Sequence, residues 1–207
     1  MRNPLQPPRS IVLVGLMGAG KTCIGKRLAQ GFDLDFRDAD TEIEAAAGMP
    51  IPEIFEVCGE GAFRDGERRV IARLLSESPH VLATGGGAFM TAATRALIKE
   101  RAISVWLRAD LDLLVRRTAR RNHRPLLNKG EPREILRKLM VERHPIYAAA
   151  DIVVDSLDGP PEQTVEKVIA ALKTYIAEHN PGPPPVTGRE TAPVGTICSG
   201  PDGKSSS

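Results

Sequence analysis

Residues 15–22 read Gly-Leu-Met-Gly-Ala-Gly-Lys-Thr, a glycine-rich loop that ends in a lysine and a hydroxyl residue. The glycines let the backbone turn so that successive N–H groups face one point, where they attract an anion. At this spacing a lysine reaches the β- and γ-phosphates of a nucleoside triphosphate, and a hydroxyl binds Mg²⁺. We therefore predict a phosphate site in which Lys21 is catalytic.

The segments that flank this loop have the character that a phosphate loop requires. Residues 11–14 have the composition of a short buried strand, and residues 23–29 that of a helix start. The amino end of a helix placed there adds positive charge to the site. A chance glycine-rich turn is the alternative, and it requires neither element. The predicted nucleotide-binding residues of this segment are Gly18, Ala19, Gly20, Lys21, Thr22 and Cys23.

Two carboxylates follow the next predicted strand, which spans residues 34–37. Asp38 and Asp40 stand at its carboxyl end, which in a parallel sheet lies on the same side as the phosphate loop. Side chains two positions apart on leaving a strand point to one face, so one carboxylate can face a metal and the other an acceptor hydroxyl. The alternative is that Asp40 only caps a helix over residues 41–47.

Three consecutive glycines, Gly85, Gly86 and Gly87, follow a predicted strand at residues 81–83. Glycines directly after a strand expose backbone N–H groups and allow a ligand to approach closely. A flexible turn is the alternative, but the position at the carboxyl end of a strand favours a ligand site.

Arginines are concentrated in the second half of the chain. A solvated helix face and a nucleic-acid surface are two interpretations of such a cluster. In a chain with a phosphate loop, a third is a lid that closes over the phosphates and supplies positive charge to the transferred group. We favour the lid, with Arg124 in its loop. The arginines are Arg116, Arg117, Arg120, Arg121, Arg124, Arg133, Arg137 and Arg143.

Apolar runs alternate with helical patterns along the chain, which predicts an α/β protein with a parallel sheet covered by helices. Helix ends are predicted from Gly31 and Gly48 as stops, from Pro52 in a first turn, and from Thr91 and Asp110 as caps. The predicted strands are residues 11–14, 34–37, 81–83, 103–107 and 152–154, and the last helix spans 161–177 with one apolar face.

Length and composition favour one domain in a reducing compartment. A chain of 207 residues with 42% hydrophobic content can bury one good core. A net charge of +2 and 4% aromatic residues indicate neither nucleic acid nor a membrane surface as partner, and no apolar run approaches the roughly 20 residues of a membrane span. The cysteines are odd in number and lack a CxxC pair, which favours the cytoplasm over a disulfide framework or a zinc site. They are Cys23, Cys58 and Cys198.

Two further residue types receive structural interpretations. Trp106 lies within an apolar strand and is predicted to pack in the core rather than to stack on a ligand. The histidines show no ligand spacing, so we assign them no chemistry. They are His80, His123, His144 and His179.

Taken together, the motifs resemble the shikimate kinase family, in its order and approximate spacing from about residue 11 to residue 175. The resemblance implies a three-layer P-loop kinase with a five-stranded parallel sheet in the order 2-3-1-4-5, a substrate-binding insertion at about 38–68 and a lid at about 118–131. The motifs are residues 15–22, Asp38-Ala39-Asp40, Phe63-Arg64 with Glu67, Ala83-Thr84-Gly85-Gly86-Gly87, Arg124-Pro125-Leu126-Leu127, and Arg143 ahead of Tyr147.

The same resemblance implies a function and its residues. The enzyme would transfer the γ-phosphoryl group of ATP to the 3-hydroxyl of shikimate, with Mg²⁺, in aromatic amino acid biosynthesis, and would be a monomer. The implied catalytic residues are Lys21, Asp40 as base, and Arg124. The implied substrate-binding residues are Asp40, Arg64, Gly85, Gly86, Gly87 and Arg143. Lys21, Arg117 and Arg124 match the nucleotide side, and Thr22 and Asp38 match the magnesium site.

The chemistry of shikimate agrees with these roles, because its carboxylate calls for planar cationic groups and its hydroxyls for an acceptor. Arg64 and Arg143 supply the first, and Asp40 supplies the second. Alternatively, Arg64 forms a surface ion pair with Glu67 at i+3, and the two interpretations are compatible. The resemblance is incomplete near Gly159, where some members carry an arginine that contacts adenine.

The predicted organisation is a flexible N-terminus at residues 1–9, one kinase domain at 10–179 and a disordered tail at 180–207, which is rich in Pro, Gly, Ser and Thr. Two other functions compete. A gluconate kinase of the same fold would share the phosphate loop and the lid but not the whole motif set. A nucleotide switch without enzymatic activity would leave Asp40, Arg64 and Arg143 without a role.

Overall fold

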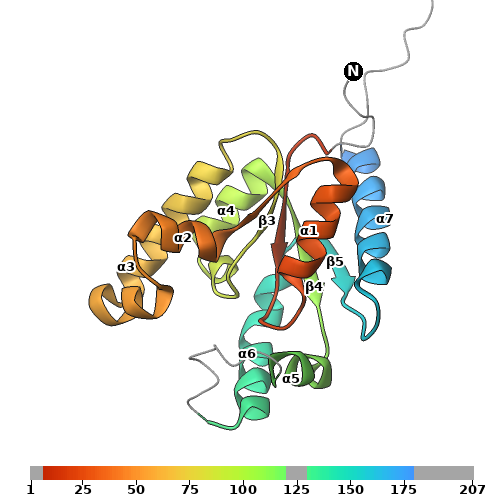
Figure 1. The fold of residues 1–207 in the computed structure, drawn as a ribbon. Coiled ribbons are helices and arrows are strands. Elements are labelled where there is room, and N and C mark those ends of the chain that lie inside the picture. Colours follow the sequence, from red (N-terminus) through yellow and green to blue (C-terminus); the bar gives the residue numbers. More distant parts are fainter. Residues whose placement is uncertain (1–6, 120–129, 180–207) are drawn as a thin grey trace, which may run out of the picture.

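The computed structural model of this chain describes residues 7–119 and 130–179. One sheet of five strands, all parallel to their neighbours, forms its centre in the order β2-β3-β1-β4-β5 (Figure 1). The predicted fold class and strand order are therefore confirmed. The strands are β1 (Ser10–Val14), β2 (Asp35–Asp38), β3 (His80–Ala83), β4 (Ala102–Arg108) and β5 (Ile152–Asp155).

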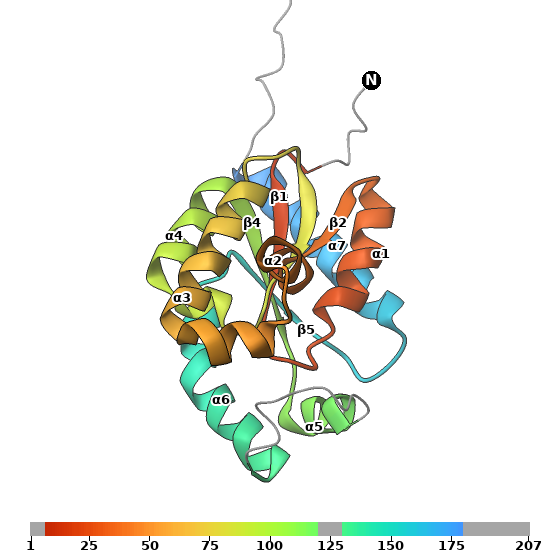
Figure 2. The ribbon, with the colours of Figure 1, turned by 60° about the vertical axis from the view of Figure 1, so that its left-hand side comes forward.

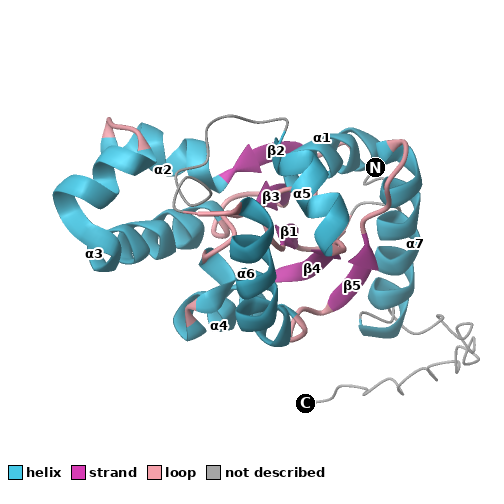
Figure 3. Ribbon diagram, turned by 90° about the horizontal axis from the view of Figure 1, so that it is seen from below, coloured by secondary structure: helices cyan, strands magenta, loops and turns pink. Residues whose placement is uncertain are grey.

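Helices cover both faces of the sheet and make three layers. Figure 2 shows α3 and α4 on one side and α1 and α7 on the other. In Figure 3, where the molecule of Figure 1 is seen from below, α2 and part of α3 project beyond β2 as an arm. The helices are α1 (Lys21–Phe32), α2 (Ala39–Ala47), α3 (Ile51–Leu74), the short 3₁₀ helix η1 (Ala88–Met90), α4 (Ala92–Arg101), α5 (Leu111–Ala119), α6 (Pro132–Tyr147) and α7 (Pro161–His179).

The core is built on the central strands. Every residue of β1 is buried, as are all but the last residue of β4, as expected for parallel strands with helices on both faces. Trp106 on β4 is 5% exposed, which confirms its predicted place in the core. Its ring packs against Tyr147, with centroids 5.8 Å apart, and against the edge of His144 at 5.0 Å. The core thus extends from the sheet to the end of α6.

Helix ends follow the predicted signals with one exception. Gly48 ends α2 with a left-handed φ of 69°, Pro52 lies in the first turn of α3, and Asp110 caps α5 by accepting from the Leu113 N–H at 2.7 Å. The stop predicted at Gly31 is wrong. Helix α1 continues to Phe32 and ends at Asp33, whose φ is 54° and whose N–H donates to the Ala29 and Gln30 carbonyls. Aspartate is one of the few non-glycine residues that adopts this conformation readily.

The arm formed by α2 and α3 contains the residues of the predicted substrate-binding insertion. Helix α3 is broken within this arm. Gly59 interrupts the helix with φ 78° and ψ 170°, a left-handed φ that favours glycine. Arg64 and Glu67 lie beyond this break, in the half of α3 that contributes Phe63 and Val70 to the core.

Several predictions fall on segments that are not described. Residues 1–6, 120–129 and 180–207 contain most of the predicted N-terminal segment, most of the lid with Arg120, Arg121 and Arg124, and the C-terminal tail. Among the described helices, none is both long enough and apolar enough to cross a membrane.

Candidate active site

The phosphate loop connects β1 to α1, in the strand, loop and helix arrangement predicted for it. Gly18 and Gly20 have left-handed φ values of 84° and 97°, which a residue with a side chain adopts only under strain. Gly20 is also the N-cap of α1, so the amino end of that helix opens into the loop. The loop therefore has the geometry of an anion site.

Lys21 folds back over this loop. Its Nζ donates to the Gly15 carbonyl at 2.8 Å and to the Leu16 carbonyl at 3.1 Å. These carbonyls belong to the first residues of the loop, so the ammonium group lies at the loop itself rather than in bulk solvent. A phosphate bound here would meet the cation without a large movement of the backbone.

Thr22 and Asp38 lie together at the predicted metal position. The Thr22 hydroxyl donates to Asp38 Oδ2 at 3.0 Å, and Asp38 Oδ1 accepts from the Asp40 N–H at 3.2 Å. Asp38 is thus the N-cap of α2, whereas Asp40 lies in its first turn. The alternative that Asp40 only caps the helix is wrong, because Asp38 is the residue that caps the amino end of α2.

The donors at this position fit magnesium. Mg²⁺ is usually held by one or two protein oxygens together with substrate phosphates and water. Thr22 and Asp38 are both partly buried oxygen donors beside the phosphate loop. Within residues 7–119 and 130–179, no group of three or more His, Cys, Asp or Glu side chains is placed to hold a metal. Two protein oxygens suit a metal whose other ligands are phosphate oxygens and water.

The three glycines after β3 bring the predicted acceptor residues together. A Cβ atom added to Gly85 would lie 2.8 Å from Asp40 Oδ1, and one added to Gly86 would lie 3.4 Å from Arg143 Nη1. On Gly87 it would lie 2.6 Å from Arg64 Nη1. Each glycine thus makes room for a charged side chain of the protein, and Gly85 for Glu67 as well. The sequence suggested that the glycines admit a ligand; in the structure their Cα atoms face the side chains of Asp40, Arg143 and Arg64.

Arg64 pairs with Glu67, as the i+3 alternative predicted, but the pair is not at the surface because the glutamate is buried. Arg64 Nη1 donates to Glu67 Oε2 at 2.7 Å, and the guanidinium also lies 5.0 Å from the centre of the Phe63 ring. Glu67 is 2% exposed. Burial raises the pKa of the Glu67 carboxyl and nearby Asp40 raises it further, while the bond to Arg64 opposes both. The ion pair is buried on the glutamate side and open on the arginine side.

Arg143 reaches the glycines from α6. Its Nη1 donates to the Gly86 carbonyl at 3.0 Å, and the hydroxyl of Tyr147, one turn later on the same helix, donates to that carbonyl at 2.5 Å. Burial raises the pKa of Tyr147 to about 12, although the Arg143 charge lowers it in part. The sequence marked Tyr147 only as part of a motif and did not reveal this bond.

Arg117 joins the phosphate loop to the segment after β5. Its guanidinium donates to Ser156 Oγ at 2.9 Å and to the Leu157 carbonyl at 2.6 Å, with a longer bond of 3.4 Å to the Gly18 carbonyl. Neither Ser156 nor Leu157 was predicted from the sequence as a site residue. Their position directly after a parallel strand on the ligand side of the sheet was the available signal.

The described arginines do not act as one group. Arg116 pairs with Asp158 at 2.6 Å, Arg133 with Asp112 at 2.7 Å and Arg137 with Glu134 at 2.5 Å. These pairs are exposed, so for these three arginines the solvated-face interpretation holds. Arg117 and Arg143 instead turn to the phosphate loop and to the glycines. Arg124, predicted to be catalytic and to bind nucleotide, lies outside the described residues.

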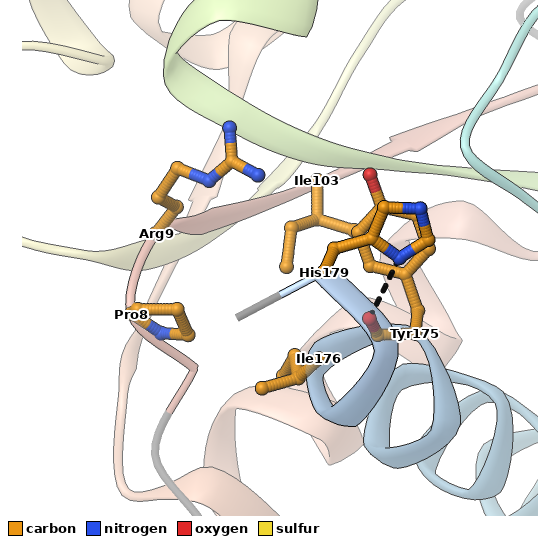
Figure 4. A pocket seen from close by; sticks show the side chains of 6 residues that line it. All are labelled: Pro8, Arg9, Ile103, Tyr175, Ile176 and His179. Carbon is orange, nitrogen blue, oxygen red and sulfur yellow. Dashed lines mark hydrogen bonds between the residues drawn. The ribbon is translucent and has the colours of Figure 1, made fainter. Parts of the chain in front are cut away.

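A cavity of about 360 Å³ lies apart from these groups (Figure 4). It is lined by Pro8, Arg9, Ile103, Tyr175, Ile176 and His179. Arg9 precedes β1 and Ile103 stands near the start of β4, so this cavity lies at the amino edge of the parallel sheet. The phosphate loop and the glycines lie at the carboxyl edge, where open α/β sheets bind their ligands.

The fold and the phosphate loop define a P-loop kinase. A family model described as shikimate kinase matches residues 17–173 of this chain. The chain belongs to the shikimate kinase family, whose members are ATP-dependent kinases.

Individual relatives agree. A shikimate kinase of Paramagnetospirillum magneticum is 60% identical over 168 residues, which cover 81% of this chain and 86% of that protein. A solved shikimate kinase from Acinetobacter baumannii, in complex with shikimate, has a TM-score of 0.77 and 40% identity and covers 80% and 93% of the two chains. A gluconokinase from Sinorhizobium meliloti has a TM-score of 0.58 and 19% identity, covering 82% and 94%, and shows a common fold alone.

Proposed function

We propose that this chain transfers the γ-phosphoryl group of ATP to the 3-hydroxyl group of shikimate, giving shikimate 3-phosphate and ADP in aromatic amino acid biosynthesis. The seating of Arg64 and Arg143 on adjacent glycines carries this proposal. Two guanidinium groups beside one loop suit a carboxylate, because each offers planar N–H donors. The 40% identical relative that was solved with shikimate supports the same acceptor.

Asp40 is the proposed base. Its carboxylate reaches Gly85, at the same glycine segment that seats the two arginines, and Asp38 relieves it of the capping role. In the reaction, the bond between the γ-phosphorus and the oxygen that bridges to the β-phosphate breaks. The 3-oxygen of shikimate bonds to that phosphorus, and its proton passes to Asp40.

The nucleotide side is proposed to consist of the phosphate loop, Lys21 and Arg117. Backbone N–H groups of residues 18–23 bind the phosphates, and Lys21 neutralises charge on the β- and γ-oxygens as it develops. Arg117 bonds to the phosphate loop and to Ser156 and Leu157, so it fixes the loop relative to the segment after β5. By the family resemblance, Arg124 completes this set.

Magnesium would be held by Thr22 and Asp38. When bound there, Mg²⁺ would offset the negative charge of the phosphates. The hydrogen bond between the Thr22 hydroxyl and Asp38 already places both oxygens on one side of the phosphate loop. We further propose that the enzyme is a cytoplasmic monomer with one domain, the monomeric state resting on the resemblance alone.

The function is tested by a coupled assay of ADP release with shikimate, gluconate and nucleoside monophosphates as acceptors. We expect turnover with shikimate that exceeds turnover with the others by orders of magnitude. Preferred use of gluconate would assign the chain to the other small-molecule kinases of this fold. ATP binding without any acceptor turnover would favour a nucleotide switch.

A further inference from the structure

Tyr147 makes a polar contact from inside the core. The residue is fully buried, and its ring packs against Trp106 and Phe89, with centroid distances of 5.8 and 6.3 Å. Its hydroxyl points away from these rings and donates to the Gly86 carbonyl at 2.5 Å. The ring is thus held by the core, while the hydroxyl reaches the glycines of the acceptor site.

The carbonyl that accepts this bond belongs to the peptide that joins Gly86 to Gly87. A peptide unit is planar, so fixing its carbonyl fixes the direction of the following N–H and of both flanking Cα atoms. The Cα of Gly86 faces Arg143 and the Cα of Gly87 faces Arg64. Glycine leaves this peptide more rotational freedom than other residues would, so its orientation depends on outside contacts.

Two donors hold this carbonyl, and they differ in kind. Arg143 is exposed in part and is proposed to bind a substrate carboxylate, which would compete for its N–H groups. Tyr147 is buried, and its pKa of about 12 keeps it a neutral donor over the range in which enzymes work. The tyrosine can therefore hold the peptide while the arginine turns to the substrate.

We propose that Tyr147 is a positioning residue for the acceptor: its hydroxyl orients the peptide between Gly86 and Gly87 so that Arg143 and Arg64 face the substrate carboxylate. This inference rests on the proposed function. It predicts that loss of the hydroxyl weakens binding of shikimate much more than binding of ATP, because Lys21 is held by the Gly15 and Leu16 carbonyls of the phosphate loop and Thr22 by Asp38.

The test is Tyr147→Phe, which keeps the ring in the core and removes only the donor. We expect the KM for shikimate to rise by about 3- to 10-fold, the range of one neutral hydrogen bond, with kcat and the KM for ATP within about 2-fold. Equal rises for both substrates, or an unchanged KM for shikimate, would overturn the proposal. Fluorescence of Trp106, the only tryptophan, offers a measurement of shikimate binding without turnover.

The matched control is Tyr175→Phe. The chain has two tyrosines, and the hydroxyl of Tyr175 donates to Asp151 Oδ1 at 3.2 Å at the opposite edge of the sheet. This variant also loses one hydroxyl hydrogen bond, but its KM for shikimate should stay at the wild-type value. If both variants raise that KM alike, the effect is one of general stability and Tyr147 has no positioning role.

A labelled protein covers the case in which Tyr147→Phe does not fold. In the Tyr175→Phe chain, biosynthetic replacement of tyrosine by 3,5-difluorotyrosine labels position 147 alone, and the fluorinated phenol loses its proton at lower pH than tyrosine does. A phenol that has lost its proton cannot donate to the Gly86 carbonyl, so the KM for shikimate should rise with pH more steeply than in unlabelled Tyr175→Phe. Parallel pH profiles would overturn the proposal. Wild-type protein that neither binds nor phosphorylates shikimate would instead overturn the proposed function.

Discussion

Arg64 and Glu67 form an ion pair whose two ends lie in different surroundings. The 2.7 Å bond joins a guanidinium that is 26% exposed to a carboxylate that is 2% exposed. Such a carboxylate loses most of its hydration, which costs free energy. Attraction to the arginine offsets part of this cost, and the bond fixes the direction of the guanidinium. The guanidinium, whose Nη2 also contacts the exposed Glu60 at 3.5 Å, is then directed to Gly87, where the acceptor is proposed to bind.

Glu67→Gln should loosen this arrangement without changing its shape. Because the neutral amide holds the guanidinium less tightly than a carboxylate does, we expect the KM for shikimate to rise by about 10-fold, with a smaller effect on the KM for ATP. Steady-state kinetics check this. Glu60→Gln is the control, because Glu60 is an exposed partner of Arg64 at 3.5 Å. A larger effect at Glu60 than at Glu67 would contradict the anchoring role.

The raised pKa of Glu67 also predicts a pH dependence of stability. A carboxyl whose pKa is higher in the folded protein binds more protons when folded, so this contribution to stability is present below the ordinary pKa of about 4.3. It is lost as the pH rises from there through the raised value. Thermal unfolding at several pH values should show wild type losing stability relative to Glu67→Gln over this window, and a constant difference would contradict the raised pKa.

Lys21→Ala should abolish most of the turnover. The variant removes the positive charge at the phosphate loop, where charge develops on the β- and γ-oxygens in the transition state. We expect kcat to fall by roughly 10² or more. Lys26→Ala, on the exposed side of the same helix, is the control and should retain wild-type kcat. Retention of more than about a third of kcat in folded Lys21→Ala would contradict the assignment of the loop.

Asp40→Asn should separate chemistry from nucleotide binding. The amide keeps the size of the side chain but cannot accept the hydroxyl proton, so we expect a large loss of kcat with little change in the affinity for MgATP. Calorimetry and kinetics measure the two quantities independently. If MgATP affinity fell and shikimate affinity did not, Asp40 would belong to the metal side and another base would be required.

The sequence reveals local features of the fold and site better than contacts between distant residues. Four of the strands and the phosphate loop follow from short patterns, since a buried parallel strand is a continuous apolar run and the loop is contiguous. The edge strand β2 reads Asp-Phe-Arg-Asp and has no such run. Asp33 as the end of α1 was missed because glycine is the usual signal there and Gly31 lies two residues earlier. The order of the strands came from the family resemblance.

Contacts across long sequence separations were not predictable in the same way. Nothing in the local sequence indicates that Gly85 meets Asp40, or that Gly86 meets Arg143 and Tyr147, because these pairs depend on how α2 and α6 pack beside β3. The resemblance named several of these residues but not their partners. The bonds from Arg117 to Ser156 and Leu157 were missed for the same reason.

The sharpest prediction concerns the carboxylate of the acceptor. An analogue of shikimate with a hydroxymethyl group in place of the carboxylate leaves the guanidinium groups of Arg64 and Arg143 without their anion. Sites built around polar partners reject such analogues strongly, so we expect kcat/KM to fall by a factor on the order of 10² to 10⁴. Arg64→Lys should not recover the kcat/KM for shikimate that Arg64→Ala loses, because an ammonium group lacks the planar pair of donors.

A double cycle decides whether Arg64 recognises that carboxylate. The kcat/KM of wild type and of Arg64→Ala is measured with shikimate and with the alcohol analogue. Arg68→Ala serves as the control, because Arg68 lies one turn further on α3 and its side chain is 44% exposed. If Arg64 contacts the carboxylate, Arg64→Ala lowers kcat/KM for shikimate much more than for the analogue, because the analogue has already lost that interaction. Arg68→Ala should leave both values near wild type. Equal losses for the two acceptors in Arg64→Ala would show that Arg64 acts elsewhere, and the proposal for shikimate would lose the pairing of cation and carboxylate on which it depends.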